Sequence, residues 1–363
     1  MSELHLDSLE ITNFRCFEHL VIEKLGRVNL IVGKNSVGKT CLLEAIRLYA
    51  TKAHRLTLWQ TLSDRGEVSG LDDIGLNHIE PIFYKWKATA GSAITIGELN
   101  NNEGRITIEV SYCMTDNDNQ IIPRIIPLDK VPFLENVQLG LVVTSEKNPQ
   151  RIYKLPISMQ PGLWMVDYSS SRENWAFVPT GGIGPSQAAQ LWDKAILEGT
   201  DYMVLDALHI LMPRIKNLNM VAEQEKPDKR SPFARIENQE KPVRLSSMGD
   251  GVMRLLGIAL SMLKAKDGYL LIDEFENGLH HSAQTRIWKF IFVLAKKLNA
   301  QVFATTHSWD CVEAFQEAAA ENEEDKDAML IRLQRKKDGT TIKAVGYDKR
   351  EMDIVTRQGI EVR

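Results

Sequence analysis

Residues 33–40 read GKNSVGKT and match the pattern G-x-x-x-x-G-K-[ST] at every fixed position. In this pattern a glycine-bearing turn leads from a strand into a helix and aims its backbone N–H groups at phosphate oxygens. The flanks fit that context. The apolar run RVNLIVG precedes the turn at 27–33, and TCLLEAIRLYA, with helical spacing of its apolar residues, follows at 40–50. The stretch therefore predicts a nucleotide-binding turn in an α/β protein.

The residues of this turn have separate roles in holding a nucleotide. Gly33 and Gly38 let the backbone fold tightly. Lys39 supplies a positive charge for the β- and γ-phosphates, and Thr40 can place its hydroxyl on Mg²⁺. We expect ATP and Mg²⁺ as cofactors. The expected contacts come from Gly33, Asn35, Ser36, Gly38, Lys39 and Thr40.

Two adjacent acids follow a second apolar run, in LLIDEFENGLHH at 270–281. Neighbouring residues of a strand point to opposite faces, and a carboxylate buried without a partner is costly. A divalent metal near Asp273 and a water near Glu274 would satisfy both acids. Asp273 is thus the predicted Mg²⁺ ligand, directly or through water, and Glu274 the residue that orients and polarises an attacking water. The alternative is that both acids are exposed in an ordinary turn.

A histidine ends the next predicted strand, in ATTHS at 304–308. Ligands of open α/β sheets bind at the carboxyl edge of the strands, so we expect Lys39, Asp273, Glu274 and His307 to meet there. A neutral imidazole can hydrogen-bond the γ-phosphate or the water, which makes His307 a second candidate catalytic residue. The alternative is a purely structural histidine at a strand end.

A second turn of small residues lies about two hundred residues after the first. It reads RLSSMGDGVMRLL at 244–256, with two serines and glycines directly before a dense apolar run. A helix N-terminus with free backbone N–H groups attracts anions, so this turn is a second candidate contact for phosphate.

Composition is that of an ordinary soluble globular protein. The chain has 363 residues, 44% of them hydrophobic and 25% charged, enough for one large domain or two ordinary ones. The 4 cysteines form no C-x-x-C pair, so neither a disulfide framework nor a zinc cluster is predicted. We find neither a signal peptide nor a run of about 18 apolar residues. By elimination, we expect a cytoplasmic protein with no membrane partner.

The charge pattern leaves nucleic-acid binding open. A net charge of −4 does not favour constitutive, electrostatically driven binding, although a local basic patch is compatible with it. The basic fragments KPDKR, at 226–230, and RLQRKK, at 332–337, are either solvated loop and hairpin faces or contacts for nucleic acid.

Proline divides the chain into three parts. All 13 prolines lie between Pro81 and Pro242. Because proline disrupts helix interiors and central strands, residues 1–80 and 243–363 are predicted to form regular sheet-and-helix structure, the two parts of one core, and 81–242 an irregular α+β insertion. In the terminal parts, strands separated by helices predict a mainly parallel sheet covered on both faces.

The expected elements follow the periodicity of apolar residues. They are strands at 4–11, 27–33, 269–273 and 301–307, helices at 40–50, 251–266 and 282–298, the last with Ser282 as N-cap, and a hairpin at 329–345 around Asp338 and Gly339.

The middle part offers two interpretations. Strand-like pieces at 105–114 and 138–145 precede a Gly/Pro loop at 178–186 and helix candidates at 188–197 and 201–212. They form either a small packed subdomain or an element for dimerisation or partner docking.

The motifs together resemble the ABC-type ATPase fold of the SMC, RecF and OLD (overcoming lysogenization defect) group. The resemblance covers 1–50 and 243–315 well and the middle poorly. It rests on LEITNFRCF (9–17) as opening strand and turn, GKNSVGKT as Walker A loop, LLIDEFENGLHH as Walker B strand and D-loop, SSMGDG (246–251) in the place of the signature motif, and THS (306–308) as switch-histidine segment. The resemblance implies that Arg15 lies near the nucleotide.

The chain departs from that group in several places. Aligning Gly249 with the second glycine of the signature makes Ser247 its serine and puts Met248 in place of the first glycine. His280 stands where many relatives have Asp, and the Q-loop glutamine cannot be placed. There is no room for a long coiled coil, which argues against an SMC protein. Residues 308–363 are too few for the TOPRIM nuclease domain of OLD proteins, so nuclease activity is not expected of this chain.

The resemblance implies a nucleotide-driven switch built from two or more copies. Each copy binds ATP, and the other copy's signature turn closes the site through Ser247, Gly249 and Gly251 at the γ-phosphate. Hydrolysis at Glu274 and product release reopen it.

Relatives without the nuclease often work with a separate effector, so we expect an ATPase that controls a partner protein, in anti-phage defence. The alternatives are a RecF-like DNA-associated ATPase and a nucleotide-binding scaffold with little turnover. A transport ATPase fits the signature and the insertion less well.

Overall fold

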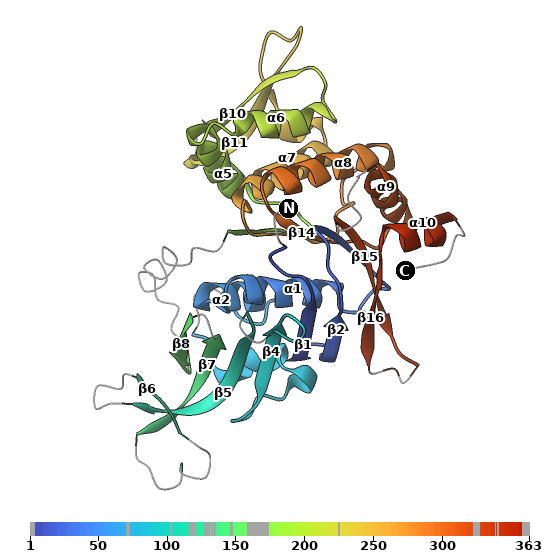
Figure 1. Cartoon of the computed structure of the whole chain (residues 1–363). Helices are drawn as coiled ribbons and strands as arrows, with labels where there is room; N and C mark the ends of the chain where they lie inside the picture. Colours follow the sequence, from blue (N-terminus) through green and yellow to red (C-terminus); the bar gives the residue numbers. More distant parts are fainter. Residues whose placement is uncertain are drawn as a thin grey trace.

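The computed structural model describes residues 4–69, 73–101, 104–115, 121–126, 131, 136–145, 148–157, 174–223, 226–321, 327–337, 339 and 341–357. Figure 1 shows helices and strands in three stacked levels, with the N-terminal and C-terminal segments side by side in the middle one.

The middle level contains a mainly parallel sheet. Its strand order is β16-β15-β3-β14-β13-β9, and every neighbouring pair is parallel except β15 and β16. The strands are β3 (Val28–Val32), β9 (Trp175–Val178), β13 (Tyr269–Ile272), β14 (Gln301–Thr305), β15 (Ala328–Arg335) and β16 (Ile342–Tyr347). The predicted parallel, covered sheet is therefore confirmed.

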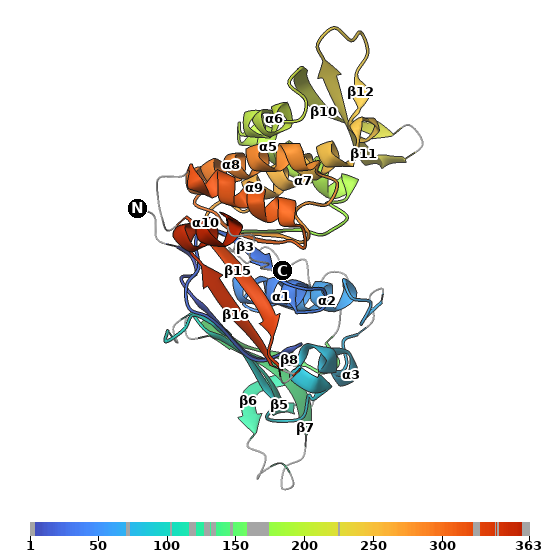
Figure 2. The ribbon, with the colours of Figure 1, turned by 90° about the vertical axis from the view of Figure 1, so that its right-hand side faces the viewer.

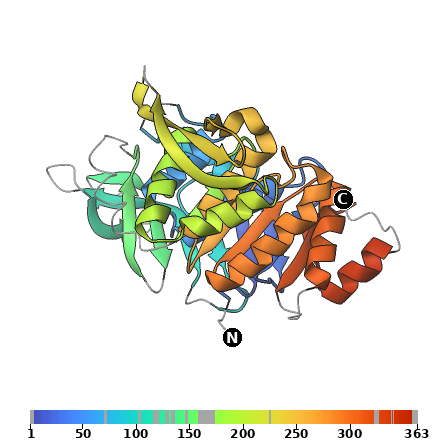
Figure 3. The same ribbon diagram turned by 90° about the horizontal axis from the view of Figure 1, so that it is seen from above.

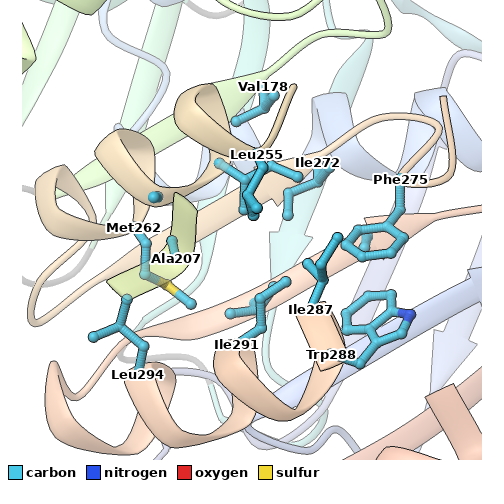
Figure 4. Packing of buried hydrophobic residues seen from close by; sticks show 14 of the residues in the cluster. Val178, Ala207, Leu255, Met262, Ile272, Phe275, Ile287, Trp288, Ile291 and Leu294 are labelled. Atoms are coloured by element: carbon cyan, nitrogen blue, oxygen red, sulfur yellow. The ribbon is translucent and has the colours of Figure 1, made fainter. Parts of the chain in front are cut away.

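Helices cover both faces of this sheet. Alternate residues of each strand point to opposite faces and pack against different helices. Leu270 and Ile272 belong to the apolar cluster with α7 (Asp250–Lys264), α8 (His281–Lys297) and α9 (Trp309–Ala320), whereas Leu271 lies in the cluster with α1 (Lys39–Ala50). Figure 2 shows α7, α8 and α9 above the sheet and α1 with α2 (Arg55–Ser63) below it. Figure 4 shows Leu255 of α7 and Ile287 of α8 on the side of the sheet to which Ile272 of β13 points.

An antiparallel sheet forms the lower level. Its order is β2-β1-β4-β5-β7-β8, and β6 pairs with β5. The strands are β1 (Leu9–Phe14), β2 (Phe17–Ile22), β4 (Ala93–Gly97), β5 (Ile106–Thr115), β6 (Ile121–Ile126), β7 (Val137–Ser145) and β8 (Asn148–Lys154); α3 (Leu76–Ile79) precedes β4. The strands expected at 105–114 and 138–145 thus join the N-terminal hairpin β1–β2 in one sheet.

The third level stands on the α7–α9 side of the parallel sheet. It consists of α5 (Pro185–Leu197), α6 (Asp201–His209), β10 (Ile215–Glu223), β11 (Lys226–Ile236) and β12 (Val243–Arg244). The three strands pair antiparallel in the order β10-β11-β12. Figure 3 shows these strands in yellow beside the green helices α5 and α6.

The middle part of the sequence is more regular than its prolines suggest. It contributes β4–β8 to the antiparallel sheet, β9 to the edge of the parallel sheet, and α5, α6, β10 and β11 to the upper level. The expectation of an irregular insertion is corrected accordingly, because this segment shares both large sheets with the chain ends.

Smaller expectations also need correction. The first strand begins at Leu9, not at residue 4. Helix α8 begins one residue before Ser282, and His280 is its N-cap, with the imidazole accepting from the Ser282 N–H. The expected turn residue Asp338 and the side chains of 226–229 lie outside the described residues. Helix α10 (Lys349–Arg357) follows the C-terminal hairpin.

Within the part of the chain that the structure describes, no helix combines the length and apolar character needed to cross a bilayer.

A fully buried glutamine joins the N-terminal segment to the parallel sheet. Gln301, the first residue of β14, accepts from the Leu6 N–H through Oε1 at 2.9 Å. Its Nε2 donates to the carbonyl oxygens of Leu6 and Gly26 at 2.8 and 2.9 Å. One side chain thus satisfies three main-chain groups at the amino edge of the sheet, away from the phosphate loop.

Replacing Gln301 with Leu should destabilise the protein, because the N–H and carbonyl of Leu6 would stay buried without partners, whereas the Gly26 carbonyl keeps its hydrogen bond from Asn29 Nδ2. Leaving two buried main-chain groups unpaired costs on the order of 3 kcal/mol in the free energy of unfolding. Urea denaturation followed by circular dichroism measures this. Gln239→Leu, at an exposed site, is the control. Equal stabilities of the two variants would contradict this account of Gln301.

Candidate functional site

The phosphate loop connects β3 to α1 with a backbone that depends on glycine. Gly33 and Gly38 have φ values of 148° and 99°, and Ser36 between them has 61°. A Cβ at Gly38 would lie 2.6 Å from Cys16 Sγ, because the β1–β2 turn packs directly against the loop. The loop therefore requires glycine for its backbone conformation and for its close packing.

Lys39 lies over this loop. Its Nζ donates to the carbonyl oxygens of Gly33 at 2.7 Å and Lys34 at 3.3 Å. Burial lowers the pKa of Lys39, while the carboxylates of Glu274, Glu276 and Asp273 act in the opposite direction. The ammonium is therefore desolvated and within the field of three acids, which suits a group that neutralises phosphate charge.

A cavity of about 400 Å³ opens beside the loop. Its lining contains the loop and the acid pair of the next motif: Cys16, Asn35, Ser36, Gly38, Lys39, Thr40, Cys41, Arg65, Asp273 and Glu274. Gly33 lies behind this lining, where its carbonyl holds Lys39. The loop residues expected to hold a nucleotide therefore surround one cavity together with both acids.

Asp273 is surrounded by hydroxyl groups. Thr305 Oγ1 donates to Asp273 Oδ1 at 2.6 Å. Thr40 Oγ1 lies 3.3 Å from Asp273 Oδ2 and Thr180 Oγ1 3.4 Å from the same oxygen. A carboxylate and a threonine hydroxyl this close are the protein ligands that Mg²⁺ uses beside phosphates and waters. In the described residues no group of three or more His, Cys, Asp or Glu forms a metal cage, so such an ion would depend on the nucleotide for further ligands.

Glu274 adopts a left-handed backbone with φ 47°. Its N–H donates to Thr305 Oγ1 at 2.9 Å, so the same hydroxyl orients both acids of the pair. The side chain is 40% exposed, and one carboxylate oxygen lies 3.8 Å from His307 Nδ1. The predicted water-activating acid and the strand-end histidine are therefore neighbours.

A third acid of this turn was not predicted from the sequence. Glu276 Oε1 accepts from the His307 N–H at 2.9 Å and lies 2.9 Å from its ring Nδ1. The Glu276 side chain is only 11% exposed, so it fixes the imidazole from the buried side. Its place two residues after Glu274, in the same turn, was the only signal in the sequence.

A second missed residue is Arg254 on α7. It is buried, and its guanidinium donates to four main-chain carbonyls, those of Pro179, Thr180, Asp273 and Glu274. An arginine four residues into a predicted apolar helix gave no indication of these contacts.

Arg15 does not line the cavity. It is buried, with Nε 3.0 Å from Glu44 Oε2 and Nη1 2.5 Å from Glu67 Oε1. Nη1 also donates to the Pro81 carbonyl at 3.2 Å. The expectation that Arg15 lies near the nucleotide stays a prediction; here its guanidinium is engaged by α1 and by the segment after α2.

The second small-residue turn lies apart from the cavity. Residues Leu245–Met248 form a 3-10 turn, and Gly249, with φ 106°, caps α7. Ser247 is exposed and donates to the Arg244 carbonyl at 2.6 Å. None of Ser247, Gly249 and Gly251 is among the residues that line the cavity beside Lys39. The structure thus brings together the loop, the acid pair and His307, and leaves this turn outside the cavity.

Comparison with known proteins gives two partial family matches. Residues 5–161 match a model described as an AAA ATPase domain. Residues 197–310 match one described as an AAA domain, putative AbiEii toxin, Type IV TA system.

Two similar proteins also carry names that refer to nucleotide hydrolysis or to DNA repair. An ATP/GTP phosphatase of Helicobacter pylori is 24% identical over 340 residues, covering 88% of this chain and 89% of that protein. A DNA replication and repair protein RecF of Listeria welshimeri is 46% identical over 55 residues, 15% of each chain.

Solved structures show the same fold. An SMC head bound to the C-terminal winged-helix domain of ScpA has a TM-score of 0.52 at 14% identity, covering 94% of this chain and 98% of that one. The SMC head domain of Pyrococcus furiosus, with an extended coiled coil and bound to the C-terminal domain of ScpA, has a TM-score of 0.50 at 11% identity, covering 98% and 99%.

Lys39→Ala should weaken ATP binding by one to two orders of magnitude, since a charge-assisted contact to phosphate is worth about 1.5–3 kcal/mol. Isothermal titration with ATP and Mg²⁺ measures the affinity. Lys24→Ala removes an exposed lysine after β2 and should bind like the wild type. Equal affinities for the Lys39 variant and the wild type would remove the phosphate loop from the site.

Proposed function

We propose that this chain, an ABC-type ATPase of the SMC/RecF-like group, hydrolyses ATP to ADP and phosphate and works as a nucleotide-driven switch of two or more copies. One observation carries the proposal. The cavity of about 400 Å³ is lined at once by Lys39, Thr40, Asp273 and Glu274, at the carboxyl edge of a parallel sheet. The phosphate-binding loop, the candidate Mg²⁺ ligands and the candidate base therefore line the same cavity.

The proposed chemistry divides among these residues. Lys39 and the loop N–H groups bind the β- and γ-phosphates, and Asp273 and Thr40 hold Mg²⁺, which would neutralise phosphate charge when bound. Glu274 accepts a hydrogen bond from the attacking water and aligns it with the γ-phosphate. His307, fixed by Glu276 at 2.9 Å, donates or accepts on the far side of that water or phosphate.

A second copy completes the site in this proposal. The turn of Ser247, Gly249 and Gly251 offers backbone N–H groups at the start of α7 but does not line its own copy's cavity. An anion-binding turn exposed at the surface is explained if it faces the γ-phosphate held by another copy. ATP then stabilises the closed assembly, and hydrolysis releases it.

Glu274→Gln should bind ATP with near wild-type affinity and hydrolyse it at least about a hundredfold more slowly, because the amide cannot accept the water's proton. The closed assembly should accumulate with ATP. Phosphate release and light scattering after size exclusion measure the two effects. Glu276→Gln distinguishes the acids, since it should reduce turnover less while it loosens His307. Normal hydrolysis by the Glu274 variant would refute this assignment of the base.

Ser247→Arg should leave ATP binding by the single copy intact and prevent ATP-dependent assembly and turnover, because a bulky side chain would stand between the turn and the partner's phosphate. Ser186→Arg places the same side chain at an exposed position in α5 and serves as control. Sedimentation velocity with and without ATP gives the result. An unchanged assembly of the Ser247 variant would leave the second turn without a role in closure.

The biological role that we propose is control of a separate effector protein in anti-phage defence. The match of 197–310 to a family described by a putative toxin of a type IV toxin–antitoxin system supports it. A RecF-like, DNA-associated role is the second candidate, favoured by the 46% identity to RecF over 55 residues. Turnover stimulated by DNA would favour the second role. A stable complex with the product of a neighbouring gene would favour the first. ATP binding without phosphate release would favour the third alternative, a nucleotide-binding scaffold with little turnover.

A further inference from the structure

Arg254 bridges two loops that meet at the end of strand β13. Nη2 donates to the carbonyl oxygens of Asp273 at 2.6 Å and Glu274 at 2.9 Å. Nη1 donates to the carbonyl of Pro179 and, at 3.4 Å, to that of Thr180. One guanidinium therefore links the turn after β13 to the turn after β9 through hydrogen bonds to both.

Burial makes this bridge rigid. Arg254 is only 4% exposed. Burial lowers the pKa of its guanidinium, and the carboxylates of Asp273, Glu276 and Glu274 oppose that shift. Arginine stays charged in proteins, and charged donors make the stronger hydrogen bonds. A planar, forked donor fixed by packing can hold several carbonyls in one geometry, which the single nitrogen of lysine cannot do.

The backbone that Arg254 holds is strained. Glu274 has φ 47°, a left-handed conformation that residues with a Cβ avoid and keep only where their surroundings enforce it. The Thr305 hydroxyl holds its N–H and Arg254 holds its carbonyl. Both ends of the residue are therefore fixed, and this sets the direction in which its carboxylate leaves the chain.

We propose that Arg254 is a positioning residue: it holds the left-handed backbone of Glu274, and so makes the water-orienting acid of each copy depend on that copy's own α7. The inference rests on the proposed function for the role of Glu274. The clamp itself stands on the four hydrogen bonds.

A coupling between two sites follows. Helix α7 begins at Asp250, directly after the Gly249 turn, and Arg254 lies in the next turn of the helix. In the closed assembly, the start of α7 would contact the partner's nucleotide while Arg254 positions the acid that acts on its own copy's nucleotide. Nucleotide in one site would then set the geometry of the acid in the other.

Arg254→Ala and Arg254→Lys test the clamp first without nucleotide. Hydrogen–deuterium exchange should accelerate in the peptide that contains Glu274, Phe275 and Asn277, whose N–H groups bond to Thr305 and to Glu274 itself. Arg27→Ala is the matched control, because Arg27 is equally buried but lies at the amino edge of the sheet, before β3. That variant should leave exchange in this peptide unchanged.

Turnover is the second readout. In both Arg254 variants kcat should fall about tenfold or more, while the Kd for ATP changes less than about threefold. The reason is that a residue that only aligns the base stabilises the transition state and not the bound ATP. Cooperativity of turnover in ATP concentration should weaken. The lysine variant keeps the charge and should remain folded, so it separates loss of the forked contact from loss of the charge.

The outcomes separate the two hypotheses. Unchanged exchange around Glu274 in both variants overturns the clamp, whatever the turnover. Faster exchange with unchanged kcat, in a wild type that hydrolyses ATP, overturns the positioning role. A wild type without phosphate release, together with faster exchange in the variants, contradicts the proposed function and leaves the clamp supported.

Discussion

Burial of the parallel sheet on both faces is the constraint on which the site depends. Strands β3, β13 and β14 are apolar on either side because helices cover both faces. Charged groups cannot lie within such a layer without partners, so polar residues collect where the strands end. Thr305, the last residue of β14, lies at that edge. Its hydroxyl donates to Asp273 Oδ1 and accepts from the Glu274 N–H at the same time. Its single side chain thus joins the ends of β13 and β14.

Sequence predicted the parts that depend on local pattern. The phosphate loop, its flanking strand and helix, and the acid pair at a strand end are each specified within about a dozen neighbouring residues, where spacing and glycine position carry the information. The meeting of Lys39, Asp273, Glu274 and His307 also followed, because the carboxyl ends of parallel strands share one edge. The catalytic roles assigned to these residues stay predictions.

Sequence did not predict the parts that depend on distant pairing. Strand β9 is four residues long and is followed at once by Pro179, yet it pairs with β13 at the edge of the parallel sheet. Proline is tolerated at that place because it stands after the strand, and the prolines of the middle part were therefore a poor sign of irregular structure. Arg15 shows the same limit, since its partners Glu44 and Glu67 lie far along the chain and determine where its charge points. Glu276 and Arg254 act through carbonyls, N–H groups and a histidine ring that no local pattern announces.

The arrangement has a consequence for how such a protein can switch. Asp273 and Glu274 are held by Thr305 from within the sheet and by Arg254 from α7. The sheet is the rigid partner, because its strands pair continuously and are covered on both faces. Helix α7 is the partner whose preceding turn is exposed, at Ser247 and Gly249. A ligand that contacts the start of α7 therefore acts on one of the two supports of the acid pair and leaves the other in place. In the proposed switch, a small displacement at the start of α7 would change the direction of one carboxylate without disturbing the fold that holds the phosphate loop.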